Sequence, residues 1–191
     1  MVGSEPEKNK ILVGGPEIRM RTERRFADFY DGALPFQMDR IPEGGMCLSV
    51  FLVLWRGNSQ NVLLGKVNPE YDWIRIGALS KEAARRIINR WMLPWSHLLL
   101  YESPQNAARR VLKEQLDVEW AEVKSLEFEV FSEDYSEPKH WDIEFVFKGE
   151  LDRLPQNPAW NEPKFVDFSK TPDQEFARRY QDILAELGLR H

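Results

Sequence analysis

The stretch around Glu114 holds side chains whose spacing could bind a metal ion. Residues three and four apart share a face of a helix, so Val111, Glu114 and Gln115 project from one side, with Glu102 and Arg110 just before them. Carboxylates on such a face bind Mg²⁺ or Mn²⁺, which are hard cations that prefer oxygen ligands. A bound ion of this kind would lower the pKa of an attacking water. Only Glu114 supplies a negative charge here, because glutamine has no formal charge and valine has no donor atom.

The stretch from Trp91 to Val118 resembles the Nudix box, the motif of enzymes that hydrolyse a diphosphate joined to another group. The family pattern is Gly, five residues, Glu, seven residues, Arg-Glu, an apolar residue, any residue, Glu-Glu, any residue, Gly and an apolar residue. Glu102, Arg110 and Glu114 match this pattern, and so do the apolar positions. Four positions differ from the pattern. Ser96 replaces the first glycine, and Val111 replaces the glutamate after the arginine. Gln115 replaces the second glutamate of the pair, and Asp117 replaces the last glycine.

The resemblance implies a Nudix α/β/α sandwich, in which a mixed β-sheet lies between helices, and a nucleotide or nucleotide-derived diphosphate as partner. It implies Mg²⁺ or Mn²⁺ as the cofactor if the protein is active. Two of the three box carboxylates are absent, so we expect hydrolysis to be weak or lost and, in that case, no cofactor. The catalytic candidates are Glu102, Glu114 and Arg110, and the candidate metal ligands are Glu114, Gln115, Glu102 and Glu144.

Each of these residues also has a plainer interpretation. Glu102 would be a favourable charge at the N-terminal end of a helix, and Glu114 a solvated helix residue. Arg110 would form a structural ion pair with Glu102 or Glu114. We expect Val111 to be at least half buried, because a valine in place of a charged residue is favourable only if its apolar surface leaves water.

Candidate substrate-binding residues flank the box. Trp95 and Ser96 stand where glycines would let a phosphate approach the backbone closely. The indoles of Trp73 and Trp141 could stack on a base, although large aromatic residues more often fill a core or an interface. Arg75 could contact a phosphate.

Two other functional classes fit the same residues. One is a non-catalytic module on a Nudix fold that binds a nucleotide, an RNA or a protein. The other is a structural role in which the aromatic surface and an additional helix form a homodimer. The number of remaining metal ligands favours the binding module over a typical hydrolase.

The composition of the 191-residue chain narrows these options. A net charge of −5 argues against nonspecific DNA binding, which normally needs a basic face. The single cysteine, Cys47, lies in an apolar run and indicates a buried small residue in a reducing compartment. No apolar segment is long enough to cross a bilayer, so we expect a cytoplasmic protein without a membrane partner.

The organisation along the chain follows from its apolar patterns. We expect a flexible N-terminal tail over residues 1–15, an extension over 16–45 that packs on the domain, and the Nudix domain over 46–191. Ser80 and Ser103 are the predicted N-caps of an inserted helix near 80–91 and of the box helix, which starts at Pro104. The predicted strands are 46–55, 62–66, 121–133, 140–149 and 164–168, and a last helix spans 172–187 before Gly188.

Overall fold

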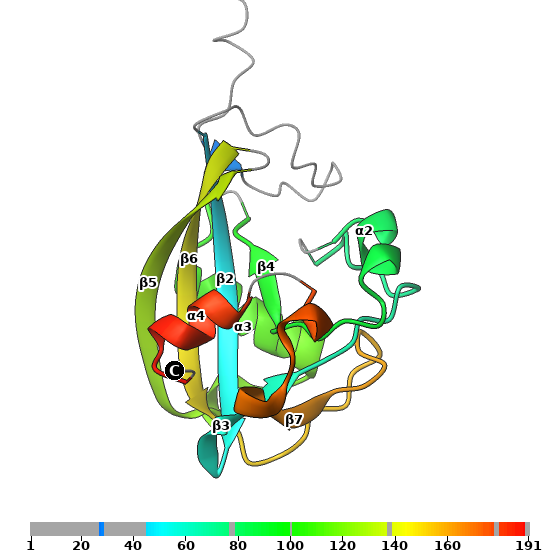
Figure 1. Ribbon diagram of the computed structural model, residues 1–191, viewed down its shortest axis with the longest axis vertical. Helices are drawn as coiled ribbons and strands as arrows, with labels where there is room; N and C mark the ends of the chain where they lie inside the picture. Colours follow the sequence, from blue (N-terminus) through cyan, green and yellow to red (C-terminus); the bar gives the residue numbers. More distant parts are fainter. Residues whose placement is uncertain are drawn as a thin grey trace, which may run out of the picture.

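A seven-stranded mixed sheet forms the centre of the molecule (Figure 1). The computed structural model describes residues 27–28, 45–76, 79–99, 101–136, 139–177 and 180–189. The strands are β1 (Ala27–Asp28), β2 (Gly45–Arg56), β3 (Asn58–Leu64), β4 (Trp95–His97), β5 (Lys124–Ser136), β6 (Lys139–Glu150) and β7 (Lys164–Asp167). The α-helices are α2 (Lys81–Arg86), α3 (Pro104–Val111) and α4 (Tyr180–Glu186). Apart from β1, the predicted N-terminal tail and extension up to residue 44 lie outside the described residues.

β2 organises this sheet because its apolar run suits burial on both faces. β6 pairs with it in parallel along its length, from Gly45 opposite His140 to Trp55 opposite Glu150. The other side of β2 is shared in turn by β1, β4 and β3. The order β5-β6-β2-β3-β7 leaves β5 at one edge. The predicted hairpin of β2 with β3 and the two long later strands are confirmed.

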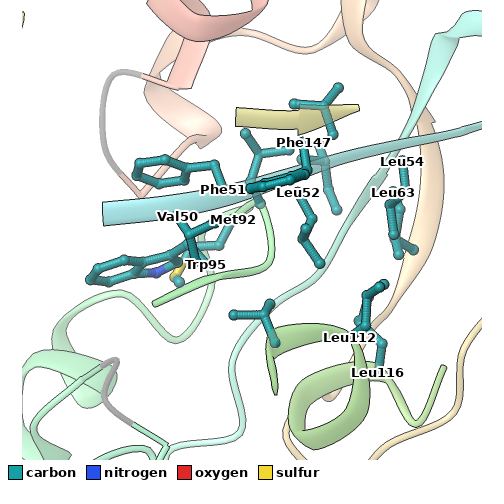
Figure 2. Packing of buried hydrophobic residues seen from close by; sticks show 14 of the residues in the cluster. Val50, Phe51, Leu52, Leu54, Leu63, Met92, Trp95, Leu112, Leu116 and Phe147 are labelled. Atoms are coloured by element: carbon teal, nitrogen blue, oxygen red, sulfur yellow. The ribbon is translucent and has the colours of Figure 1, made fainter. Parts of the chain in front are cut away.

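Helices cover both faces of the sheet, as the sandwich prediction requires: α3 lies behind it and α4 in front (Figure 1). α3 buries Ala107, Ala108 and Val111, and α4 buries Ile183 and Leu184. Figure 2 shows Leu112 and Leu116 pointing from the helix that continues α3 toward Leu63 and Leu54 of the sheet. One contiguous apolar core therefore joins this helix to the strands.

α3 begins where the sequence predicts. The Ser103 hydroxyl accepts a hydrogen bond from the Asn106 N–H at 3.2 Å, and Pro104 occupies the first turn. The helix then widens into a π-helical turn, Leu112–Leu116, and stops at Asp117, whose φ is +52°. The box pattern has a glycine at this position, where backbone in the left-handed region is needed.

Two helices are shorter than predicted. The helix expected near 80–91 is α2, which Ser80 caps as predicted but which ends at Arg86. The helix expected over 172–187 is reduced to a 3₁₀ turn, Asp173–Glu175, and α4, while Gly188 follows its end at a φ of +66° as predicted. Trp91 forms a parallel bridge with Phe176, and its N–H and C=O bond to Glu175 and Ala177, so both segments must be extended there.

Candidate functional site

Arg110 joins the box helix to the residues before it. Its Nε and Nη2 each donate to a different oxygen of Glu102 at 2.8 Å. Its remaining donors reach the carbonyl oxygens of Ile76 (2.7 Å) and His97 (2.9 Å) and the Ser96 hydroxyl (3.0 Å). Both partners of the ion pair are nearly buried, with 13% and 11% of their side chains exposed. Arg110 therefore pairs with Glu102, one of the two alternatives expected, and its bonds to Ser96 and His97 join helix α3 to β4.

Glu102 and Ser96, which accept hydrogen bonds from Arg110, make further hydrogen bonds within the protein. A Glu102 oxygen accepts the N–H of Leu99 at 2.9 Å in addition to the guanidinium. Ser96 is fully buried, and its hydroxyl donates to the Ile76 carbonyl at 2.9 Å while accepting from Arg110. Glu102 and Ser96, predicted to meet metal and phosphate, are thus held within the protein's own hydrogen-bond network.

The side-chain amide of Gln115 bonds to the backbone of β4 as a neighbouring strand would. Its Nε2 donates to the Trp95 carbonyl at 2.5 Å, and its Oε1 accepts the Trp95 N–H at 3.3 Å. The residue is fully buried. Val111 is 1% exposed, so the prediction that it is at least half buried is confirmed. Two of the positions where the box pattern has carboxylates, 111 and 115, are therefore part of the core.

Glu114 lies at the edge of this buried face. Its side chain is 28% exposed, and one carboxylate oxygen lies 3.8 Å from Nη1 of Arg75, whose own side chain is 58% exposed. The other oxygen, Oε2, is buried and has no hydrogen-bond partner among the residues that the structure describes. Such an atom costs about 1–3 kcal/mol unless something else satisfies it.

The carbonyls at the end of the helix are held by side chains from distant segments. The Tyr71 hydroxyl and the Asn157 amide donate to the Glu114 carbonyl at 3.1 and 3.2 Å, and the Trp160 indole donates to that of Gln115 at 2.9 Å. A helix end leaves such carbonyls without an intrahelical partner. These three bonds fix the orientation of the face that carries Glu114.

The donor set at the box does not fit a divalent ion. Mg²⁺ needs near-ideal octahedral geometry and usually one or two carboxylates. Of the three box positions only Glu114 offers a carboxylate, since Gln115 is bonded to Trp95 and Val111 is buried carbon. Within the described parts of the chain, no three acidic, histidine or cysteine residues are arranged to hold a metal ion.

The candidate tryptophans lie in different surroundings. Trp73 is 1% exposed, donates to the Asn68 carbonyl and meets Trp160 edge-on at 5.1 Å, so the packing interpretation describes it. Trp141 is 55% exposed on β6. Trp95 is 7% exposed and stacks on Phe51 at 5.9 Å. Its indole Nε1 is buried and has no hydrogen-bond partner within the described ranges.

A buried polar cluster crosses β2, β4 and β6; the sequence pointed to Cys47 and Glu144 but did not place them together. The Cys47 sulfur lies 3.1 Å from Nδ1 of His97, and the Ser49 hydroxyl donates to Asp142 at 3.0 Å. Glu144, a candidate metal ligand, is 2% exposed and lies opposite Ser49 in the strand register. A signal was present, because Cys47 and Ser49 lie two apart in a strand and therefore share one of its faces.

A small pocket opens beside the loop that carries Arg75. Its volume is about 150 Å³, and it is lined by Glu70, Tyr71, Asp72, Trp73, Ile74 and Lys81. Ligand sites for drug-sized molecules measure about 300–1,000 Å³. This pocket is therefore too small to enclose a nucleotide.

Comparison with known proteins identifies the fold. No family model and no curated protein sequence matches the chain. Among solved structures, it resembles the NUDIX domain of NrtR from Shewanella oneidensis, complexed with ADP ribose, at 15% identity over 80% of this chain and 92% of that one, with a TM-score of 0.52. A NUDIX hydrolase from Nitrosomonas europaea is 14% identical over 75% of this chain and 90% of its own, with a TM-score of 0.48. At such identities the likeness shows the fold alone, and that fold is the Nudix fold.

Proposed function

We propose that this chain, which has the Nudix fold, binds a nucleotide-derived diphosphate and hydrolyses it weakly or not at all. One observation carries the proposal: the Gln115 amide is bonded at both ends to Trp95, beside a Val111 that is 1% exposed. Gln115 and Val111, on the helix face that would hold a metal ion, are therefore buried in the core. The box geometry has been kept as scaffold while its donor set has not.

The surroundings of the box support a polar ligand. Arg75 presents an exposed guanidinium, and the carboxylate of its acidic neighbour Glu114 lies 3.8 Å away, beyond a hydrogen bond. A guanidinium binds phosphate oxygens in a bidentate manner, so a diphosphate would compete well for it. The exposed Trp141 on β6 offers a face on which a base could stack. The Shewanella domain, which is complexed with ADP ribose, favours this ligand class.

The hydrolase alternative uses the carboxylates that remain. Glu114 would have to bind the ion with one partner from outside the box, and Glu102 is tied to Arg110 by two hydrogen bonds of 2.8 Å. Releasing Glu102 would leave the guanidinium nearly buried without its counter-charge, which is costly. This cost is the reason that we favour binding over turnover.

A binding and turnover panel tests the proposal. The full chain is titrated calorimetrically with ADP-ribose, a dinucleoside polyphosphate, NADH and an oxidised dNTP, and product formation is followed with Mg²⁺ and with Mn²⁺. We expect binding of at least one diphosphate, with metal-dependent turnover weak or absent. Arg75→Ala should weaken this binding by about tenfold, the equivalent of about 1.4 kcal/mol. Arg86→Ala, which removes a similarly exposed arginine paired with Glu82 on α2, is the matched control. Turnover at rates typical of enzymes, about 1 s⁻¹ or more, would contradict the proposal.

A further inference from the structure

The outer edge of β5 combines an apolar face and an acidic face. Phe128 and Val130 are 48% and 51% exposed and lie opposite Phe147 and Phe145 of β6. Glu127 and Glu129 project from the other face. Within the described ranges β5 pairs with β6 alone, so its other edge presents backbone donors and acceptors. An open edge of this kind is a template for another strand.

The charges on this edge select the type of strand that can pair with it. Lys148 lies within salt-bridge distance of both Glu127 and Glu129, so a single positive charge balances two carboxylates. A second β5 placed alongside would bring like charges together, which is unfavourable. A strand that alternates apolar and basic residues would instead match both faces.

The sequence near the N-terminus has this alternation. Residues 18–21 read Ile-Arg-Met-Arg, with apolar side chains at even positions and arginines at odd positions. We call these four residues the N-terminal arm. We propose that the N-terminal arm of a second copy of the chain pairs with the β5 edge in an antiparallel register that places Met20 opposite Phe128.

In that register each arginine of the arm lies opposite a glutamate of β5, and each apolar residue lies opposite an apolar one. Arg21 and Arg19 face Glu127 and Glu129 on one side of the sheet, because opposite residues of an antiparallel pair share a face. Ile18 then faces Val130 on the other side. Burying the exposed halves of Phe128 and Val130 adds the apolar contribution that an isolated ion pair at the surface lacks.

The length of the chain assigns the arm to a second copy. Its connection to the domain is β1, which pairs with β2 on the side away from β6. A strand beyond β5 lies four strand spacings from β1, about 19 Å across the sheet. The strand registers pair Ala27 with Met46, Met46 with Trp141, and Trp141 with Asp134, so Ala27 and Asp134 lie at the same height in the sheet. Phe128 lies about 20 Å from Asp134 along β5. The resulting separation of about 28 Å exceeds the reach of the seven residues from Met20 to Ala27, which is about 24 Å.

Cross-linking tests both the register and the second copy. Met20→Cys with Phe128→Cys should form a covalent dimer on mild oxidation of the full chain, because facing residues come within disulfide distance. Met20→Cys with Gln60→Cys, an exposed position on β3, is the control and should form no covalent dimer. A cross-linked monomer, or no cross-link at the Met20–Phe128 pair, would overturn the proposal. Cys47 is buried and does not interfere.

Charge reversal tests the pairing independently. Arg19→Glu with Arg21→Glu should raise the dimer dissociation constant at least tenfold, as should Glu127→Arg with Glu129→Arg. Combining the two pairs of changes should recover the dimer. Arg24→Glu with Arg25→Glu makes the same change in charge outside the arm and should leave the dimer intact. The arm variants alter no residue of the described sheet, so a folded wild-type protein that is monomeric, or equal dimerisation of the arm and control variants, would refute the assignment.

Discussion

The amide of Gln115 makes two hydrogen bonds to the backbone of Trp95, at 2.5 Å to its carbonyl and 3.3 Å from its N–H. An amide can form this pair because it carries a donor and an acceptor on one planar group. A carboxylate has acceptors alone. The residue at this position therefore decides whether the helix supports β4 or binds a cation.

Gln115→Glu should destabilise the protein although the two side chains have almost the same shape. The carboxylate would face the Trp95 carbonyl without a proton to donate, at a fully buried position. We expect the free energy of unfolding to fall by about 1–3 kcal/mol or more, measured by urea denaturation. Glu114→Gln makes the reverse change one residue earlier, where the side chain is partly exposed, and should alter stability by less. Equal effects of the two variants would contradict the assigned role of Gln115.

Arg110→Ala should cost about 3–5 kcal/mol of stability, because it leaves the nearly buried Glu102 carboxylate without its partner. It also removes the donors to the carbonyls of Ile76 and His97. The neighbouring Arg109 is exposed and lies over the Trp120 ring at 4.7 Å, so Arg109→Ala is the matched control, with an expected loss of about 1 kcal/mol or less. Thermal and chemical unfolding of the two variants would show the difference, and a small effect at Arg110 would refute the bridging role.

Local patterns predicted β2, β3, β5, β6 and β7 and the starts of α2 and α3, but not the short strands β1 and β4 or the start of α4. The apolar run of β2 is long enough to require burial, and the serines at 80 and 103 offer oxygens to the first turns, so neighbouring residues suffice for both predictions. The helix ends could not be predicted in the same way. Trp91 and Phe176 are far apart in sequence, and the bridge between them interrupts two segments whose own pattern is helical.

The candidate site was predictable in its positions and less so in its contacts. The box pattern located Glu102, Arg110 and Glu114 on or beside one helix. That Gln115 bonds to Trp95, and that Ser96 bonds to Ile76, depends on how β4 packs against this helix. Helical periodicity places a residue on a face, but it does not say which backbone lies opposite.

Glu122 provides a prediction for pH. The Arg153 guanidinium, and after it the Glu119 backbone N–H, lower the pKa of this carboxyl to about 2 from 4.5. Because the folded pKa is lowered, the contribution of the pair to stability is complete above pH 4.5 and is lost as the pH falls toward 2. Arg153→Ala should raise the pKa of Glu122 toward 4.5, though not fully, since the Glu119 N–H remains. Carbon-13 NMR titration of the glutamate carboxyls measures this, and an unchanged pKa in the variant would exclude Arg153 as the main cause.

Rebuilding the carboxylates of the box should not rebuild a metal site. Val111→Glu combined with Gln115→Glu supplies three carboxylates at the family spacing, yet both positions are buried, and the second would also lose its bonds to Trp95. We expect a loss of about 3 kcal/mol or more from Val111→Glu alone, against about 1–2 kcal/mol for Val111→Ala, which deletes apolar contacts without introducing a charge. Native-state binding of Mg²⁺ would raise the melting temperature of the double variant, because a ligand that binds only the folded state stabilises it. We expect millimolar Mg²⁺ to change that temperature no more than it does in the wild type. A larger rise, accompanied by hydrolysis of any diphosphate in the panel, would show that two side chains are all that separates this chain from an active enzyme.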